Sequence, residues 1–327
     1  MTDLRTTYMG LELENPLVVA SCSLSKTLEG IQKCADAGAG AIVLKSIFEE
    51  QISGEMKKME PDSWIQWHAE AFQYTSNLGM ELGPREYLKL IGQAKAKTSF
   101  PIIASLNCIS QKWWGDFAQQ VEAAGADALE LNISFLPSDP CRSSADIEKQ
   151  YCSILEETKK LIKIPVAVKI GPYLTSAASV AGALDLRGAA ALVLFNRFFR
   201  FDIDIENLKL SAGYRFSSAE EINFPLRWIS LLSGRVKCDL AASTGVHDHE
   251  GVIKQLLAGA TVVQLCSTLY INGLTQIAAI RGRVEEWMKA KDFASVGDFR
   301  GKMSQLQSDK PELYERLQYI KTLVGIE

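Results

Sequence analysis

Short, nearly continuous apolar runs recur along the chain and alternate with amphipathic stretches. Such runs are typical of strands that are buried on both faces of a parallel sheet. Amphipathic segments at Trp113–Ala124, Asp146–Ile162 and His249–Ala258 predict helices between them. The predicted strands are Leu17–Ser21, Ala41–Ser46, Pro101–Asn107, Ala128–Ser134, Val166–Gly171, Ala191–Asn196, Asp239–Thr244 and Val262–Ser267.

The phrases "AGA" and "RGA" precede several of these strands, as at Ala124–Ala126 and Arg187–Ala189. Each indicates a helix that a glycine ends just before the next strand. Eight strands that alternate with helices predict a single (β/α)8 TIM barrel, an α/β fold. An open doubly wound sheet is the alternative, but no G-x-G-x-x-G motif follows the first strand.

Residues 1–327 are expected to form one barrel domain with two long loops, at about 49–83 and 197–223. Long excursions in a compact domain often serve as lids or binding loops. Within the second, "RFFRFDIDIENLKL" alternates apolar and charged residues and predicts an extra hairpin over the C-terminal mouth of the barrel.

The formal net charge is −4, which gives no reason to expect nucleic acid or an anionic membrane as a partner. The chain has no apolar run long enough to span a bilayer and no signal-peptide pattern at its start, so we expect a cytoplasmic protein. Its seven cysteines form no C-x-x-C pair. His247 and His249 are expected in a solvated turn at a helix start, and no metal site is predicted.

Every predicted strand ends in polar residues, and two of them end in a lysine between apolar residues, Lys45 and Lys169. In a barrel of this type the active site lies at these carboxyl ends. A buried lysine needs an anionic partner, which is either Glu130 or an anionic ligand. The last two strands close with hydroxyl-bearing turns that lead into helices, which suits a phosphate group.

Several motifs in order resemble the dihydroorotate dehydrogenases, and they are also similar to the flavin barrel of the dihydropyrimidine dehydrogenases. The resemblance covers about Met9 to Lys302. It implies a (β/α)8 barrel that holds FMN at the strand ends and moves two electrons to or from a pyrimidine ring. The motifs are "NPLVVAS", "LKS", "SNLGM", "DALELNIS", "VAVKIGPY", "LFN" and "ASTGV…GATVVQLCSTLY".

The resemblance also implies roles for residues that match the family's motifs. Lys45 falls beside both flavin and substrate, and Lys169 falls where a cation stabilises negative charge on the flavin. The matched substrate-binding residues are Asn77, Asn132 and Asn196. The matched cofactor-binding residues are Ala20, Ser21, Lys45, Ser46, Asn107, Asn132, Lys169, Ser243, Thr244, Gly245, Cys266 and Ser267.

The chain departs from the family pattern at Phe135. The family has a cysteine or serine there, the base that takes a proton from the substrate, and phenylalanine cannot accept a proton. Ser134 and Cys141 are the candidate substitutes, although a loop cysteine more often has no catalytic task. Arg197 stands where relatives have a small polar residue, so it is a candidate for binding a different anion. "SSAEEINFP" replaces a glycine-rich turn.

The first hypothesis is therefore an FMN-dependent oxidoreductase that acts on a pyrimidine-like or other small anionic ring. A flavin-binding subunit or sensor without turnover is the second. A barrel that binds a phosphate ligand without redox chemistry is the third. The resemblance implies a homodimer, and fumarate, a nicotinamide nucleotide and a partner subunit all stay open as electron acceptors.

Overall fold

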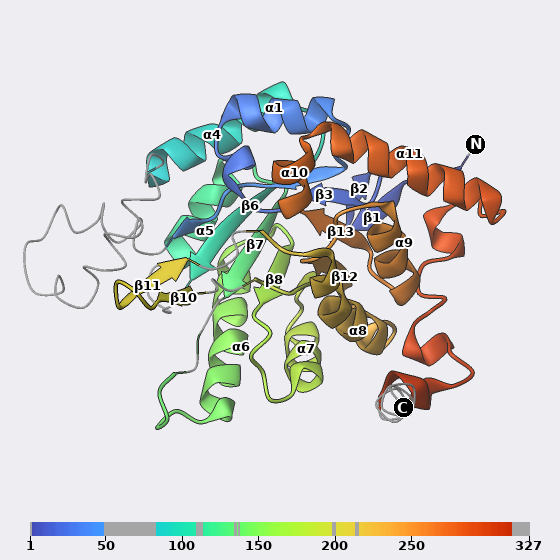
Figure 1. Cartoon of the computed structure of the whole chain (residues 1–327). Helices are drawn as coiled ribbons and strands as arrows, with labels where there is room; N and C mark the ends of the chain where they lie inside the picture. Colours follow the sequence, from blue (N-terminus) through green and yellow to red (C-terminus); the bar gives the residue numbers. More distant parts are fainter. Residues whose placement is uncertain are drawn as a thin grey trace, which may run out of the picture.

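A ring of eight parallel strands forms the centre of the protein (Figure 1). The computed structural model describes residues 2–48, 83–108, 114–133, 136, 138–197, 201–212 and 216–315. The strand order is β4-β3-β13-β12-β9-β8-β7-β6, and β4 also pairs with β6, so the ring closes into a barrel. The two-residue strand β5 (Ile47–Phe48), which follows β4 in the chain, also pairs with β6. The strands are β3 (Leu17–Val19), β4 (Ala41–Val43), β6 (Ile102–Cys108), β7 (Ala128–Ile133), β8 (Val166–Ile170), β9 (Ala191–Leu194), β12 (Asp239–Ser243) and β13 (Val262–Leu265). The (β/α)8 prediction is confirmed, and the open sheet is not what forms.

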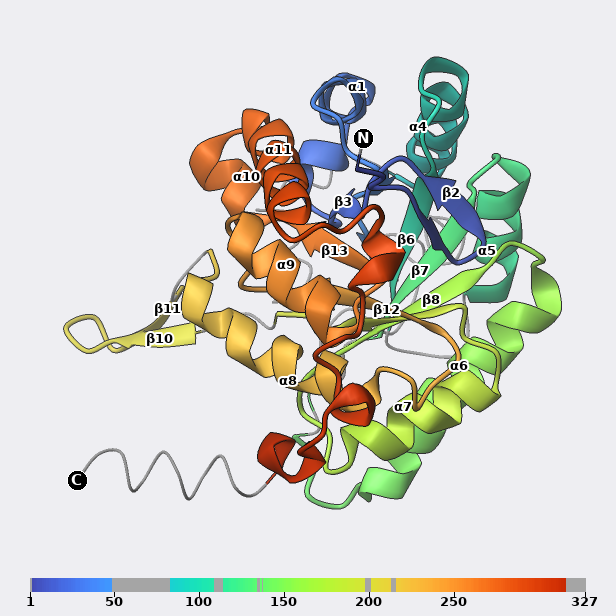
Figure 2. The ribbon, with the colours of Figure 1, turned by 90° about the vertical axis from the view of Figure 1, so that its right-hand side faces the viewer.

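Helices surround the barrel on its outside, as Figure 2 shows. Several begin at a side chain that caps the first turn: Ser143 accepts from the Asp146 N–H, and Asp248 accepts from the Gly251 N–H. The helices are α1 (Leu28–Asp36), α4 (Pro84–Lys97), α5 (Trp114–Ala123), α6 (Ser144–Leu161), α7 (Ala177–Leu186), α8 (Asn223–Leu232), α9 (His249–Ala258), α10 (Ser267–Asn272) and α11 (Thr275–Ala290). Single 3-10 turns are η1 (Ser23–Ser25), η2 (Ala219–Ile222), η3 (Val296–Asp298), η4 (Gln305–Gln307) and η5 (Pro311–Tyr314).

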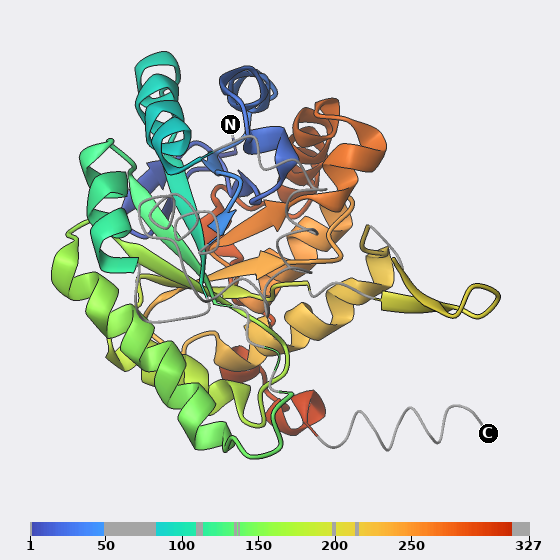
Figure 3. The same ribbon diagram turned by 90° about the vertical axis from the view of Figure 1, so that its left-hand side faces the viewer.

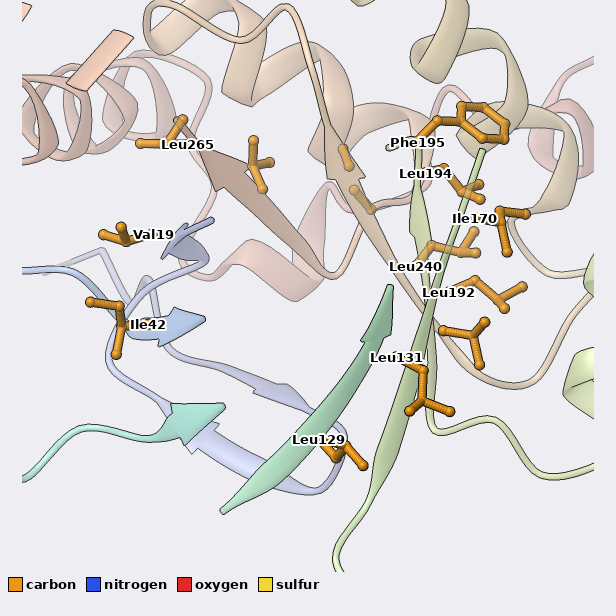
Figure 4. Close-up of a cluster of buried hydrophobic side chains, with 14 of the residues drawn as sticks. Val19, Ile42, Leu129, Leu131, Ile170, Leu192, Leu194, Phe195, Leu240 and Leu265 are labelled. Carbon is orange, nitrogen blue, oxygen red and sulfur yellow. The ribbon is translucent and has the colours of Figure 1, made fainter. Parts of the chain in front are cut away.

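The main core lies between the outer face of the barrel and these helices. Alternate residues of each strand point outward, such as Leu192 and Leu194 on β9 or Leu129 and Leu131 on β7 (Figure 4). These side chains are almost completely buried. The apolar run of each strand is therefore explained by burial on both faces, because the inward-facing residues are covered as well.

A short hairpin, β1 (Thr6–Tyr8) and β2 (Leu11–Leu13), closes the amino-terminal end of the barrel. Its Tyr8 and Leu13 pack against small inward-facing residues such as Ala128 and Ala191 at the strand starts. The Met9 N–H donates to the Asp239 carboxylate at 2.7 Å and ties the hairpin to β12. The lower barrel is thus a packed core, and the polar strand ends lie at the other end.

The segment 197–223 contains the predicted hairpin, β10 (Phe201–Asp204) and β11 (Lys209–Ala212). Figure 3 shows it extending outward from the barrel body. Ile203, Ile205, Leu208 and Leu210 on it are exposed. Most of the other predicted loop, residues 49–82, lies outside the described residues. Among the helices that the structure describes, none is both long and apolar enough to cross a bilayer.

Candidate active site

Three polar side chains from neighbouring strands lie in one register row at the carboxyl end of the barrel. Asn107 of β6 pairs with Asn132 of β7, and Asn132 pairs with Lys169 of β8. Asn107 and Asn132 are half-buried, whereas Lys169 is buried. The row brings together two amides and one cation that the sequence predicted at the ends of three different strands.

Lys169 is held inside the barrel by a buried network. Its ammonium lies 3.8 Å from Glu130 Oε1 and donates to Gln264 Oε1 at 3.1 Å. The Gln264 amide in turn donates to Glu130 Oε2 at 2.6 Å. Glu130 is therefore the counter-charge of Lys169, as one of the two readings of the sequence proposed. Glu130 Oε1 itself accepts no hydrogen bond within the described part of the chain.

Lys45 has a different environment from Lys169. It follows β4, is half-buried, and its ammonium lies 5.4 Å from the centre of the Phe48 ring. Burial lowers the pKa of the Lys45 ammonium, and the nearby Cys22 and Cys266 thiols oppose that shift. Among the described residues no carboxylate forms an ion pair with Lys45, which is its main difference from Lys169.

A chain of hydroxyl groups lies beside Lys45. The Ser46 N–H donates to Ser21 Oγ at 2.8 Å, and the two hydroxyl oxygens are 2.9 Å apart. Ser46 Oγ is also 2.8 Å from Ser105 Oγ, and the Ser105 N–H donates to the Tyr87 hydroxyl at 2.8 Å. Ser21 and Ser46 were predicted site residues, and the structure joins them. Ala20 next to them is buried, and its N–H donates to the Leu265 carbonyl.

The turn after β12, one of the two predicted phosphate turns, has a tight backbone conformation. Thr244 and Gly245 both have positive φ, 81° and 78°, and a side chain on Gly245 would meet the Ile222 nitrogen at 2.1 Å. Only glycine therefore fits at that position. The Thr244 hydroxyl donates to the Phe195 carbonyl at 3.3 Å, and Ser243 is buried below it.

The turn after β13 is joined to the segment before α8. Ser267 Oγ accepts from the Ser217 N–H at 3.0 Å, and Ser217 Oγ lies 3.1 Å from His247 Nε2. The Thr268 hydroxyl donates to the His247 carbonyl at 2.8 Å. The segment "SSAEEINFP" thus contacts both candidate phosphate turns through Ser217.

Arg197 is engaged by a neighbouring acid. Its guanidinium donates to Glu221 at 2.9 and 3.3 Å, and to the Phe216 carbonyl at 3.1 Å. Both side chains of the ion pair are largely buried. Glu221 also accepts from the Ser218 N–H and completes the capping box of η2. Arg197 therefore fastens the loop after β9, and its charge is balanced before any ligand binds.

The remaining candidates are less informative. Asn77, Ser134 and Phe135 lie outside the described residues. Asn196 is half-buried, and its N–H donates to the Ile170 carbonyl at 2.8 Å. Cys141 is exposed, and its N–H donates to the Asp139 carboxylate at 2.9 Å. The described contacts do not link Cys141 to the other candidate residues.

Histidines and acids do not gather into a metal site in the described ranges, where no group of three or more His, Cys, Asp or Glu side chains could hold an ion. Asp248 is the N-cap of α9, so the His247–His249 stretch is the helix start that the sequence indicated.

Four residues of this region were not predicted as site residues: Gln264, Ser105, Ser217 and Cys22. A single polar residue inside an apolar strand, as in "VVQLC", was the available signal for Gln264.

Known proteins are similar to this chain over most of its length. The family model described as dihydroorotate dehydrogenase matches residues 3–288. The catalytic subunit of dihydroorotate dehydrogenase B (NAD+) from Thermoplasma acidophilum is 26% identical, over 92% of this chain and 99% of its own length. The Lachnoclostridium phytofermentans protein of the same name is 25% identical over 90% and 97%. The chloroplastic dihydropyrimidine dehydrogenase (NADP+) of Arabidopsis thaliana is 22% identical over 96% and 80%.

The family match spans most of the chain and includes the strand ends at which Lys45, Asn132 and Lys169 lie. The closed barrel and the polar carboxyl end are consistent with it. The chain belongs to the dihydroorotate dehydrogenase family of oxidoreductases.

Proposed function

We propose that this protein is an FMN-dependent oxidoreductase that acts on a CH–CH bond of a pyrimidine-like or other small anionic ring. The observation that carries the proposal is the row of Asn107, Asn132 and Lys169 at the carboxyl end of the barrel. It presents amide groups and a cation where enzymes with this fold bind their substrates. The names of the relatives, which refer to dihydroorotate and dihydropyrimidine, support a pyrimidine-like ring.

The residues present fit an FMN group. Gly245 lets the turn after β12 pack against the Ile222 backbone, and Ser243, Thr244, Cys266 and Ser267 are the residues that would hold the phosphate. Ala20, Ser21, Ser46, Asn107 and Lys169 would line the rest of the cofactor. When bound, FMN supplies an acceptor or donor of hydride at its N5 atom.

The chain's own side chains would orient the substrate and stabilise charge. Lys169 supplies a positive charge that Glu130 and Gln264 keep in place. Lys45, without a described acidic partner, would pair with an anionic group of the ring substrate. Asn132, with Asn77 and Asn196, would donate and accept hydrogen bonds at the ring's polar edge. Arg197 would act on the site only through the position of its loop, because Glu221 already neutralises it.

Proton removal is the step at which this chain departs from its relatives, because Phe135 has no group that accepts a proton. General-base assistance contributes roughly 10² to 10⁴-fold to a rate. We therefore propose slow turnover of dihydroorotate and a preferred substrate that needs no base at this position. Cys141 is exposed and stays only a candidate substitute for the base.

A second candidate is a flavin-binding subunit without turnover, which the same Phe135 favours. The relatives named as catalytic subunits support a partner protein as the electron acceptor. The proposal also includes a homodimer of this chain. Light scattering of the purified chain measures the oligomeric state.

Rapid anaerobic mixing with dihydroorotate tests the proposal, with the bleaching of the flavin absorbance as the signal. We expect slow bleaching in the natural protein and roughly 10² to 10⁴-fold faster bleaching in Phe135→Cys. Equal, fast rates in both would show that another residue is the base. Bound flavin that neither protein reduces with dihydroorotate or any other dihydropyrimidine would favour the second candidate.

A further inference from the structure

Two cysteines meet where the neighbouring strands β3 and β13 end. Val19 pairs with Leu265 in the parallel register, and the Ala20 N–H donates to the Leu265 carbonyl at 2.9 Å. Cys266 follows directly, and Cys22 lies two residues beyond Ala20. Each of the two thiols shifts the pKa of the other, so they lie within interaction range of each other. The register of β3 and β13 places the two thiols on segments that the sheet holds side by side.

The segments that follow the two cysteines are also tied to each other. Tyr270 of α10 accepts a hydrogen bond from the Ser23 N–H at 2.9 Å, and its hydroxyl also contacts Ser23 Oγ. On the other side of Cys22, Ser25 Oγ donates to the Cys22 carbonyl at 2.9 Å. The sheet on one side and Tyr270 on the other therefore hold the two cysteine-bearing segments side by side.

The surroundings make the two thiols chemically unequal. The neighbouring Cys266 thiol lowers the pKa of Cys22, and the positive charge of Lys45 contributes in the same direction. The neighbouring Cys22 thiol and burial raise the pKa of Cys266. Thiolates are the reactive form of cysteine, so these opposite shifts favour Cys22 over Cys266 as the nucleophile.

The four other cysteines whose side chains the structure describes lack this combination. Burial raises the pKa of Cys34 to about 12 and also raises that of Cys152. Burial likewise raises the pKa of Cys238. Cys141 is exposed, but the described contacts give it no thiol neighbour. Cys34 lies close enough to Cys22 to feel its charge, so it is the competing partner that an experiment must exclude.

We propose that Cys22 and Cys266 form a peroxide-reactive dithiol that closes to a disulfide at the edge of the candidate active site. The Cys22 thiolate attacks one oxygen of a hydroperoxide, so that an S–O bond forms, the O–O bond breaks and the other oxygen leaves. With hydrogen peroxide the leaving hydroxide takes a proton and becomes water.

In the second step Cys266 loses its proton and attacks the Cys22 sulfur. The S–S bond forms, the S–O bond breaks, and the hydroxide that leaves takes up the proton as water. Two thiols are oxidised by two electrons in total, and one hydrogen peroxide is reduced to two waters. The disulfide links the end of β3 to the turn that carries Ser267, so oxidation would restrict that candidate phosphate turn.

Peptide mapping of the full-length chain tests the proposal. The protein is reduced, freed of reductant, treated with an equimolar amount of hydrogen peroxide, alkylated and digested with trypsin without reduction. Lys26 and Lys33 separate Cys22 from Cys34, and Lys254 separates Cys238 from Cys266, so each pairing gives a different cross-linked peptide. We expect the Cys22–Cys266 peptide. A Cys22–Cys34 peptide, or oxidation of Cys141 alone, would overturn the proposal.

Single substitutions separate the roles of the two thiols. In Cys266→Ser the sulfenic acid at Cys22 should persist and be trapped by dimedone. In Cys22→Ser we expect Cys266 to be oxidised about tenfold more slowly than in the natural protein, because burial still raises the pKa of its thiol. Cys141→Ser is the matched control and should form the cross-link unchanged. Equal oxidation of Cys266 with and without Cys22 would contradict the proposal.

Discussion

The Lys169 ammonium lies 3.8 Å from the Glu130 carboxylate, deep inside the barrel and bridged by Gln264. The exposed fractions of the two side chains are 8% and 1%, so neither charge is balanced by bulk water. A buried ion is costly unless it has both a counter-charge and hydrogen bonds, and Glu130 and Gln264 supply them. The site can therefore keep a cation in place before a ligand arrives.

Glu130→Gln removes the counter-charge and leaves Lys169 buried without it. Breaking a buried ion pair costs about 3–5 kcal/mol, and we expect a loss of unfolding free energy of that order in urea denaturation. Lys169→Met in the same chain should recover part of the loss. An unfolding free energy equal to that of the natural protein would show that the ion pair does not stabilise the fold.

Glu29→Gln is the matched control for this prediction. Glu29 also pairs with a lysine, Lys33, but both side chains are exposed on α1. Exposed pairs are screened by water, so no measurable change is expected. A similar loss in both variants would point to a general effect of removing negative charge.

Lys45→Met should stabilise the ligand-free protein while weakening its function. Burial lowers the pKa of Lys45, which means that folding disfavours its charged form. Removing the charge should raise the melting temperature by roughly 2 °C, the shift of a gain below 1 kcal/mol in a chain of this size. Differential scanning calorimetry measures it, and a lower melting temperature would contradict the expectation.

The gain from Lys45→Met should also depend on pH. The folded pKa of Lys45 is below the unfolded one, so the cost of its charge is fully present at neutral pH. That cost disappears as the pH rises through the lowered pKa towards the ordinary value of 10.5. The melting temperatures of variant and natural protein should converge in alkaline buffer, and a constant difference would contradict burial as the cause.

Gly245→Ala should damage the turn after β12. Gly245 has positive φ, and a Cβ atom there would approach the Ile222 nitrogen to 2.1 Å, so the backbone must shift. We expect a loss of about 1–3 kcal/mol in unfolding free energy and weaker FMN binding. Gly182→Ala in α7 is the control, because nothing lies within 4 Å of its added Cβ. There alanine should stabilise by roughly 0.5–1 kcal/mol.

Asn132→Ala should weaken substrate binding. An amide that hydrogen-bonds a ligand contributes about 0.5–1.5 kcal/mol, so Kd should rise by up to about tenfold. Titration of the flavin spectrum with orotate measures this change. Asn207→Ala at the tip of the β10–β11 hairpin is the control, since Asn207 contacts only Asp204 among the described residues. An unchanged Kd in Asn132→Ala would remove Asn132 from the substrate site.

Local sequence pattern was enough to predict the barrel. The predicted strand Ala128–Ser134 is observed as Ala128–Ile133, and the predicted helix His249–Ala258 has those bounds. Strands buried on both faces must be apolar along their length, and helices on the outside must be amphipathic. Both requirements are visible within a few neighbouring residues, which is why the pattern succeeds.

Contacts between distant residues could not be predicted in the same way. Gln264 and Glu130 are 134 positions apart, and nothing near "VVQLC" indicates that its glutamine meets a carboxylate. The acidic partner of Arg197 could not be predicted either, because Glu221 is 24 positions away in the sequence. Cys22 and Cys266 likewise meet only because β3 closes the ring against β13. Such partners are set by the closure of the barrel.

The visible absorbance spectrum of the purified full-length chain tests the central claim most directly. The protein is incubated with excess FMN, passed through a desalting column and compared with a sample that received no flavin. We predict a retained flavin band that corresponds to about one FMN per chain, as expected for a specific site. A folded protein that keeps no flavin after this treatment would contradict the assignment of FMN to the ends of β3, β4, β6, β8, β12 and β13.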